Sequence, residues 1–364
     1  MEDLVNPASG LWRGRSVLVT GHTGFKGAWL ALWLARLGAH VHGYALDPPT
    51  SPSLFEAARV AGMLASDTRA DLADLDALRS VFDRAQPEVV FHLAAQSLVR
   101  ESYLDPLATF ATNVMGTAHV LEAARSIADI RAIVVVTTDK VYENRESMHA
   151  YGERDPLGGH DPYSASKAAT EIVAASYRSS FFTGRDAQAP RLATARAGNV
   201  IGGGDWAKDR LVPDALRCFG TGEPLCLRFP AAVRPWQHVL EPLSGYVRLA
   251  EALLGSEGEQ FASAWNFGPA EGNMASVGDV AAAIARLWGG GARVEASTDA
   301  NPHEAGLLML DSRRAHEVLA WRPRWSLDHA LARTVAWQRE WRGGADMQAT
   351  TLAQIDDYMS MGPA

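Results

Sequence analysis

Short apolar runs alternate with longer segments of helical periodicity along the first half of the chain. Four runs have the length and β-branched content of strands that are covered on both faces: 16–20 (SVLVT), 40–46 (HVHGYAL), 88–93 (EVVFHL) and 131–137 (RAIVVVT). Amphipathic helices are expected over 28–37, 72–84, 106–126 and 162–182. This alternation of strands and helices before residue 200 is typical of βαβ units. It predicts a doubly wound α/β fold with a parallel (Rossmann) sheet.

The second half differs, because glycine- and proline-rich turns such as GNVIGGGDW and FPAAVRP separate short elements. Two more helices are expected over 277–288 and 327–341. We predict a Rossmann domain, a smaller C-terminal α/β lobe that shapes a pocket, and a polar tail that is either loose or docks a partner. The Rossmann domain is expected over 1–195, with a return segment near 235–260. The lobe is expected mainly over 196–341, and the tail over 342–364.

The composition is that of an ordinary globular protein, with 47% hydrophobic and 21% charged residues. The net charge is −8 and the lysines and arginines are scattered, so no nucleic-acid partner is expected. We find neither a signal peptide nor an apolar stretch of about 18 residues for a membrane span. Cys218 and Cys226 have no disulfide spacing and are expected to be packing residues in a reducing compartment. We therefore expect a cytoplasmic protein that contacts no membrane.

A glycine-rich segment, Gly21-His-Thr-Gly24-Phe-Lys-Gly27, lies between the first strand and the first helix. Backbone N–H groups and the positive helix end can hold a pyrophosphate there. A plain strand-to-helix turn would use the same glycines, but Asp47 follows Gly27 by 20 residues (47 − 27), the place for a carboxylate that bonds the adenosine ribose. Asp71 is placed to reach the adenine, or else forms a surface turn. Because the Asp47 carboxylate repels a 2′-phosphate and no arginine follows it, the pattern predicts NAD and not NADP.

A tyrosine and a lysine lie four residues apart, at Tyr163 and Lys167, and hence on one face of a helix. Such a pair often occurs by chance, but this one accompanies Thr137-Thr138-Asp139-Lys140 at the end of the predicted strand 131–137. The segment His92 to Ser97 (HLAAQS) supplies a neighbouring wall. We expect Lys167 to lower the pKa of the Tyr163 phenol and make it a base for a substrate hydroxyl. The histidines His22, His92, His160 and His238 have no metal-binding spacing, so no metal is expected.

These motifs resemble the extended short-chain dehydrogenase/reductase family, and within it the nucleotide-sugar 4,6-dehydratases of the CDP-glucose branch. The similar segments include GHTGFKGAWL, HLAAQSLVRESY, TTDKVYENRE, GGHDPYSASK, RAGNVIGGGDW and RPWQHVLEPLSGY. They span about residues 16 to 268, with a weaker match to Leu331. The resemblance implies bound NAD, and it implies cofactor contacts at Gly21, Thr23, Gly24, Phe25, Gly27, Asp47, Asp71, Leu72, Ala94, Ala95, Asn113, Tyr163 and Lys167.

The resemblance also implies a lyase reaction of deoxysugar biosynthesis. Tyr163 takes the C4 hydroxyl proton while hydride passes to NAD, water leaves across C5 and C6, and the hydride returns to C6. Thr138 shares the 4-oxygen with the tyrosine, and Asp139 protonates the leaving hydroxyl, so it should be desolvated. Lys140 stands where dehydratases of dTDP-glucose have Glu, either as a base of depressed pKa or as a stabiliser of the enolate. Substrate contacts are expected at Gln96, Asn199, Arg210, Arg234 and His303, and a homodimer is expected from pairing of the helices 106–126 and 162–182.

Three functions are thus left open. The preferred one is dehydration of CDP-D-glucose to CDP-4-keto-6-deoxy-D-glucose. A nucleotide-sugar 4-epimerase, or a dehydratase of another nucleotide sugar, shares the glycine segment and the Tyr163 and Lys167 pair, but an epimerase has no use for Asp139 and Lys140. A catalytically idle NAD-binding sensor should have lost part of this set, which is complete.

Overall fold

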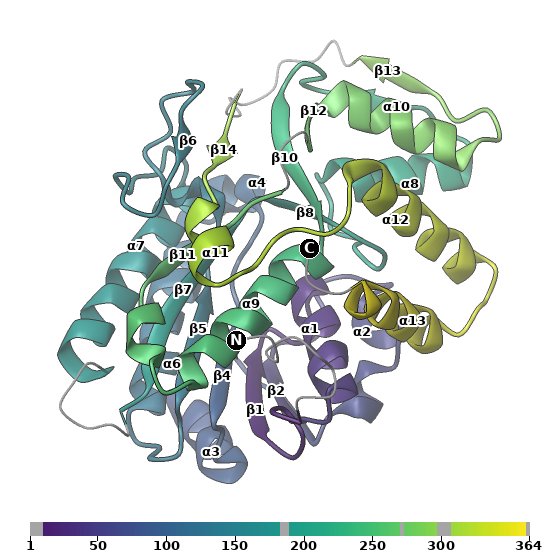
Figure 1. Ribbon diagram of the computed structural model, residues 1–364. Coiled ribbons are helices and arrows are strands. Elements are labelled where there is room, and N and C mark those ends of the chain that lie inside the picture. The colour runs from purple at the N-terminus through teal and green to yellow at the C-terminus, as the bar shows by residue number, and fades with distance from the viewer. Residues whose placement is uncertain (1–9, 183–188, 270–272, 297–306, 362–364) are drawn as a thin grey trace.

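The computed structural model describes residues 10–182, 189–269, 273–296 and 307–361. Its centre is a seven-stranded sheet in which every neighbouring pair is parallel, in the order β11-β7-β5-β4-β1-β2-β3 (Figure 1). The strands are β1 (Ser16–Thr20), β2 (His40–Ala45), β3 (Ser66–Arg69), β4 (Val89–His92), β5 (Ala132–Val136), β7 (Arg191–Ala197) and β11 (Ala264–Phe267). The order reverses between β1 and β4, which is the switch point where this fold binds ligands. The predicted doubly wound α/β fold is confirmed.

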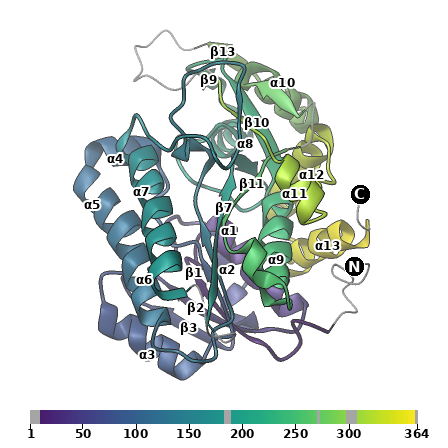
Figure 2. The ribbon, with the colours of Figure 1, turned by 60° about the vertical axis from the view of Figure 1, so that its left-hand side comes forward.

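Helices cover both faces of the sheet because its strands alternate apolar side chains between two cores. Leu18 and Val90 face one core with α3 and α6, whereas Val17 and Val89 face the other with α1 and α9. Figure 2 shows α3, α5, α6 and α7 on one side of the strands and α9 on the other. The helices in the first half are α1 (Phe25–Arg36), α2 (Leu54–Ala57), α3 (Leu75–Ala85), α4 (Val99–Leu104), α5 (Pro106–Phe110), α6 (Gly116–Ala124) and α7 (Pro162–Tyr177).

The helices expected over 106–126 and 162–182 are present, each with a π turn. The first consists of α5, a π turn (Ala111–Met115) and α6, and the second is α7 followed by a π turn (Arg178–Phe182). β3 was not predicted, because its sequence SDTR is polar and it lies at the sheet edge. Edge strands need no apolar run, so periodicity does not reveal them.

The second half forms a separate core around a three-stranded sheet, in the order β12-β10-β8, and three helices. These elements are β8 (Asn199–Ile201), β10 (Val233–His238), β12 (Met274–Ser276), α8 (Leu211–Thr221), α10 (Val277–Trp288) and α12 (Leu327–Arg342). There are also two short two-stranded sheets. One pairs β9 (Leu225–Leu227) with β13 (Val294–Ala296), and the other pairs β6 (Ala150–Tyr151) with β14 (Met309–Leu310). The chain also returns to the large sheet through α9 (Leu240–Leu254) and β11. The division into domains stays a prediction.

The segment 342–364, for which a loose tail or a docking segment was left open, contains the helix α13 (Met347–Ser360). It packs against α1 and α12 and buries Ile355 and Tyr358 (Figure 1). A short helix, α11 (Arg313–Val318), precedes α12. The expectation that both cysteines are packing residues is wrong for Cys226, which is exposed on β9 while its neighbours Leu225 and Leu227 face the core. No helix in the described ranges is long and apolar enough to cross a membrane.

Candidate active site

The glycine segment forms a tight turn between β1 and α1. Gly21 has a φ of +77°, and a Cβ there would lie 2.6 Å from the backbone nitrogen of Ala94, just after β4. A Cβ on Gly27 would lie 2.0 Å from the carbonyl oxygen of Gly21. The helix begins at Phe25 after Gly24, which has no side chain to cap it. The first N–H groups of α1 therefore face the strand ends and can bind an anionic group such as a pyrophosphate.

The ribose end of the candidate cofactor site contains an arginine that the sequence did not reveal. Asp47 follows β2 with a side chain that is 90% exposed, and Arg69 at the end of β3 lies 3.3 Å from its carboxylate. Arg69 also binds Asp67 and stacks over the ring of Phe55. No arginine follows Asp47 directly in the sequence, but strand pairing brings Arg69 beside it from 22 residues away.

Three other predicted cofactor residues surround this site through backbone and packing contacts. The Thr23 hydroxyl donates to the carbonyl of Leu46 (3.0 Å). The Asp71 carboxylate accepts a bond from the amide of Ala73, so it also forms the turn that was its alternative role. Leu72 is buried, and a Cβ on Gly116 would touch it.

The loop after β4, with Ala94, Ala95 and Gln96, is held by polar side chains from the helix that follows. The buried Asn113 accepts a bond from the Gln96 amide (2.8 Å) and donates to the Gln96 carbonyl (3.0 Å) and to Ser166 on α7 (2.8 Å). The Gln96 side chain bonds Leu98 and the Thr109 hydroxyl. Both side chains thus fix the wall of the site, and their predicted cofactor and substrate contacts stay predictions.

The predicted catalytic residues meet where β5 ends and α7 begins. The Thr138 hydroxyl donates to Asp139 Oδ1 at 3.0 Å. Burial raises the pKa of Tyr163 to about 12, whereas the neighbouring Thr138 hydroxyl and the charge of Arg210 lower it. The pKa of the phenol is therefore raised and not lowered as expected. The Lys167 ammonium donates to the carbonyl of Val136, and burial lowers its own pKa to about 8.

Asp139 occupies the desolvated position that its predicted acid role requires. It is 2% exposed, and burial raises the pKa of its carboxyl although Lys140, Arg234 and Lys26 act in the opposite direction. Within the described residues, its Oδ2 has no hydrogen-bond partner. A Cβ on Gly198 would lie 3.0 Å from this oxygen, so glycine leaves it room.

The remaining predicted residues lie on both sides of this centre. Lys140 is partly exposed in the turn after β5, and Asn199 begins β8. Arg210 binds Asp205 (3.0 Å) and the Ser97 hydroxyl (3.2 Å) and acts electrostatically on Tyr163. Arg234 is buried on β10 and acts on Asp139, so both arginines lie near the catalytic groups. His303 lies outside the described residues.

A buried polar network behind the catalytic lysine was not predicted. Glu171, one turn after Lys167 on α7, accepts bonds from the hydroxyls of Thr137 (2.5 Å) and Thr194 (2.7 Å) and from the guanidinium of Arg196 (2.7 Å). These bonds and the charge of Arg196 lower the pKa of Glu171 against its burial, and Glu171 in turn raises the pKa of Lys167. In the sequence, the spacing of four residues between Lys167 and Glu171 was the feature that could have indicated this network.

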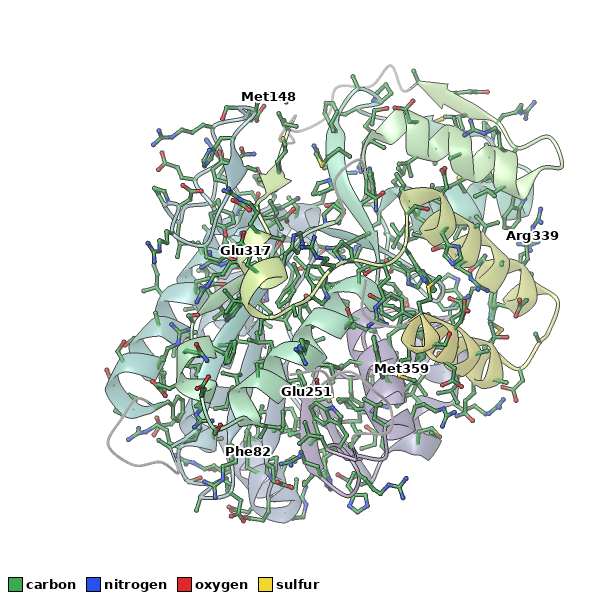
Figure 3. All side chains as sticks on the ribbon, in the orientation of Figure 1. Phe82, Met148, Glu251, Glu317, Arg339 and Met359 are labelled. Carbon is green, nitrogen blue, oxygen red and sulfur yellow. The ribbon has the colours of Figure 1, made fainter. Side chains whose placement is uncertain are left out.

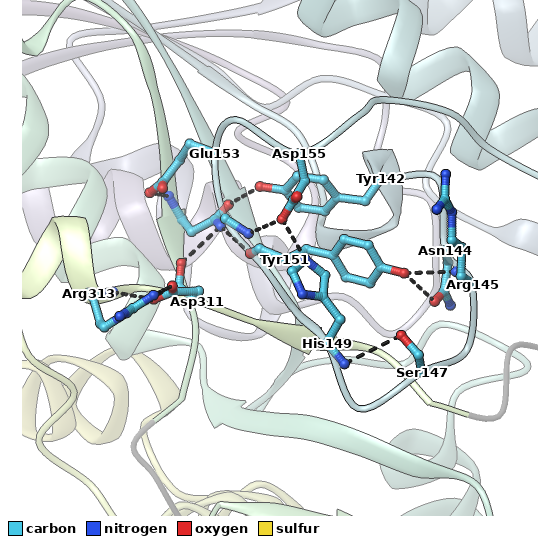
Figure 4. Close-up of polar contacts among 12 residues, drawn as sticks. Tyr142, Asn144, Arg145, Ser147, His149, Tyr151, Glu153, Asp155, Asp311 and Arg313 are labelled. Atoms are coloured by element: carbon cyan, nitrogen blue, oxygen red, sulfur yellow. Dashed lines mark hydrogen bonds and ion pairs between the residues drawn. The ribbon is translucent and has the colours of Figure 1, made fainter.

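The loop between the catalytic turn and α7 is fixed against the second half of the chain (Figure 4). Asn266 donates to the carbonyls of Tyr151 (2.8 Å) and Asp311 (3.0 Å) and accepts a bond from the Tyr142 hydroxyl (2.7 Å). Asp155 accepts bonds from the Gly152 amide and from His149. These contacts hold β6 beside β14 and so position the loop that leads to Tyr163.

Two of the histidines without metal spacing are packing residues. His92 at the end of β4 bonds the hydroxyls of Thr20 (2.7 Å) and Thr117 (3.0 Å), and burial lowers its pKa to about 3. His22 is fully buried beside Asp67 (2.8 Å). In the described ranges, no group of three or more His, Cys, Asp or Glu residues is arranged to hold a metal ion.

Comparison with known proteins is consistent with this site. A family model described as GDP-mannose 4,6 dehydratase matches residues 18–186. The CDP-glucose 4,6-dehydratase of Salmonella typhimurium LT2 is 48% identical over 96% of this chain and 97% of its own. Among solved structures, the UDP-glucose 4-epimerase of Thermotoga maritima with UDP-glucose has a TM-score of 0.78 at 20% identity, covering 90% and 99% of the two chains. The dTDP-glucose 4,6-dehydratase of Streptomyces venezuelae with NAD bound has a TM-score of 0.75 at 25% identity, covering 91% and 99%. The chain therefore belongs to the CDP-glucose 4,6-dehydratase family.

Proposed function

We propose that this protein is an NAD-dependent lyase that converts CDP-D-glucose to CDP-4-keto-6-deoxy-D-glucose. The observation that carries the proposal is that Tyr163 lies with Thr138 and the buried carboxyl of Asp139 in one cluster, in which Thr138 donates to Asp139. Oxidation at C4 needs a base such as Tyr163, and only dehydration also needs an acid for the C6 hydroxyl. The extensive similarity to the Salmonella dehydratase supports CDP-glucose as the substrate.

The cofactor site fits NAD. The N-terminus of α1 suits the pyrophosphate and the exposed Asp47 suits the ribose hydroxyls. Glycine at positions 21 and 27 permits the tight backbone turn that leads into α1, because a Cβ at either position would collide with neighbouring backbone. When bound, NAD accepts hydride from C4 and returns it to C6, and the positive charge of its oxidised ring favours the Tyr163 phenolate. Lys167 is placed on the same helix face to hold the nicotinamide ribose.

The residues of this chain then divide the proton transfers. Tyr163 removes the C4 hydroxyl proton, and Thr138 holds the 4-oxygen. The ketone acidifies C5–H, whose proton passes to solvent water and returns to C5 when hydride reaches C6. Lys140, in the turn after β5, is the cation nearest in sequence that can stabilise the intervening enolate. Asp139, whose pKa is raised by burial, gives its proton to the C6 oxygen as the C6–O bond breaks and water leaves.

A product assay tests this function. Purified protein is incubated with CDP-glucose and NAD, and the mixture is made alkaline. Absorbance of an enone is the expected result, because a 4-keto-6-deoxy sugar forms one in base. A new hexose without this absorbance would favour a 4-epimerase, and an unchanged substrate would favour a binding protein. Tyr163→Phe should abolish turnover, and full turnover by this variant would refute the assigned base.

We also infer that the protein is a cytoplasmic homodimer. The two helices that pair in the family, 106–126 and 162–182, expose large apolar side chains here: Leu107 (81%), Met115 (53%), Ile172 (62%) and Phe181 (47%). Such an uncovered apolar face is typical of an interface. Light scattering should give a dimer mass for the protein and a monomer mass for Leu107→Asp. The control Met148→Asp changes an equally exposed residue in the loop before β6 (79%) and should stay dimeric (Figure 3).

A further inference from the structure

Glu171 and Arg196 form a buried ion pair that the reaction described above does not use. Arg196 Nη2 lies 2.7 Å from Glu171 Oε2, and the two side chains are only 4% and 3% exposed, respectively. A buried ion pair usually adds little net stability, because removing two charges from water costs about as much as their attraction returns. Stability alone therefore does not account for the pair, so the groups that it holds are informative.

The pair holds both ends of the catalytic turn, residues 138–140. Directly before the turn, the buried Thr137 hydroxyl donates to Glu171 Oε1 at 2.5 Å. After the turn, the buried Tyr142 hydroxyl accepts a bond from Arg196 Nη1 at 2.8 Å. The Arg196 guanidinium also lies over the Tyr142 ring, 5.1 Å from its centroid. One ion pair thus fixes the chain on each side of the turn.

The same contacts fix α7, which carries the catalytic tyrosine and lysine, against the end of β5. Lys167 precedes Glu171 by one helical turn, and its ammonium donates to the carbonyl of Val136 at 3.2 Å. Val136 and Thr137 are consecutive, so two successive residues at the strand end hold two successive turns of the helix. The base on α7 and the acid in the catalytic turn therefore share one anchor.

We propose that Glu171, paired with Arg196, is a positioning residue that aligns the catalytic turn with the base on α7. Its carboxylate oxygens bind protein donors, so it acts through Thr137 and not on the substrate itself. In the proposed dehydratase reaction, on which this inference rests, Thr138 and Asp139 act on two different oxygens of one sugar. A displacement of the turn would disturb both contacts, and a misplacement of about 1 Å can cost about 10²-fold in rate.

Two matched substitutions separate positioning from a structural role. Thr137→Val and Thr194→Val each remove one buried hydroxyl that donates to the Glu171 carboxylate. They should lower the urea midpoint of unfolding by similar amounts, because each removes one hydrogen bond. Only Thr137 adjoins the catalytic turn, so Thr137→Val should lower kcat by about 10-fold at unchanged KM, and Thr194→Val by less than about 2-fold. Thr137→Ser keeps the hydroxyl and should restore most of kcat.

Glu171→Gln tests the carboxylate itself. The amide keeps the size of the side chain but replaces one accepting oxygen with a donor, so Thr137 and Arg196 lose one of their two acceptors. The kcat should fall by about 10²-fold, while the dissociation constant of NAD changes by less than about 2-fold. In the double variant with Thr137→Val the two losses should not multiply, because both act through one contact. If Glu171→Gln fails to fold, the two threonine variants decide the question.

Hydrogen exchange gives a readout that does not depend on turnover. The amides of residues 139–142 should exchange faster in Thr137→Val than in the wild type, whereas Thr194→Val should leave their exchange unchanged. Equal kcat and equal exchange in these two variants would overturn the proposal, because the hydroxyls would then have only a structural role. A wild-type protein that forms no enone product would refute the proposed function, and the exchange rates would still test the anchoring of the turn.

Discussion

Glu251 provides a quantitative test of how burial controls the charges in this fold. It lies on α9, is 6% exposed, and accepts a bond from the indole nitrogen of Trp12 (2.8 Å), while its second oxygen has no partner among the described residues (Figure 3). Burial raises the pKa of Glu251 from 4.5 to about 7. The folded protein therefore binds more protons than the unfolded chain between these values, and its stability falls as the pH rises through them.

Glu251→Gln keeps the acceptor for Trp12 and removes the ionisation. A difference of about 2.5 pKa units at about 1.4 kcal/mol each means that ionised Glu251 costs about 3 kcal/mol above pH 7. The variant should thus be more stable than the wild type by about 3 kcal/mol near pH 8, and by less than half of that near pH 5.5.

Urea unfolding followed by tryptophan fluorescence at these two pH values measures the difference, at fixed protein and NAD concentrations. The control Glu317→Gln removes the same charge from an exposed position on α11 (Figure 3) and should have little effect at either pH. The reasoning is refuted if Glu251→Gln gives the same stability change at both pH values, or a change no larger than that of the control.

Three further predictions concern the site itself. Asp47→Ser should shift the cofactor preference towards NADP, because it frees Arg69 to bind a 2′-phosphate, and the ratio of the two dissociation constants measures this. Gly27→Ala should weaken NAD binding by at least about 10-fold, since its Cβ would overlap a backbone oxygen, and fluorescence titration reports the loss. Gly198→Ala should lower kcat with unchanged NAD affinity, because the new methyl group would press on Asp139 at 3.0 Å; equal kcat values would contradict this.

The periodicity of apolar residues predicted those helices and strands in which buried positions recur at a regular spacing. These elements determine the fold. The helix 277–288 has the predicted bounds, because Val280, Ala281 and Ile284 repeat on one face. The polar edge strand β3 and the packed helix α13 were missed, because their positions depend on partners distant in sequence. Local patterns carry no information on such partners.

Prediction of the candidate site also succeeded for local motifs and failed for partners distant in sequence. Motifs at strand ends predicted Gly21, Thr138 and Tyr163, because the topology of a parallel sheet places those ends together. Arg69 was missed beside Asp47, because only strand pairing brings the two together. The pKa of Tyr163 was misjudged for a different reason: the spacing places Lys167 on the same helix face, but burial raises the pKa of the phenol and lowers that of the lysine.

The charge of the site contrasts with that of the chain. The net charge is −8, yet the groups that act on Asp139 or Tyr163 include four cations, Lys26, Lys140, Arg210 and Arg234. Despite this surrounding positive charge, burial keeps the pKa of Asp139 raised. Desolvation therefore outweighs Coulombic attraction at this carboxyl. The arrangement permits two requirements of the proposed reaction to be met together: a positive field attracts a substrate that carries a diphosphate, while burial favours the neutral form of the proposed acid.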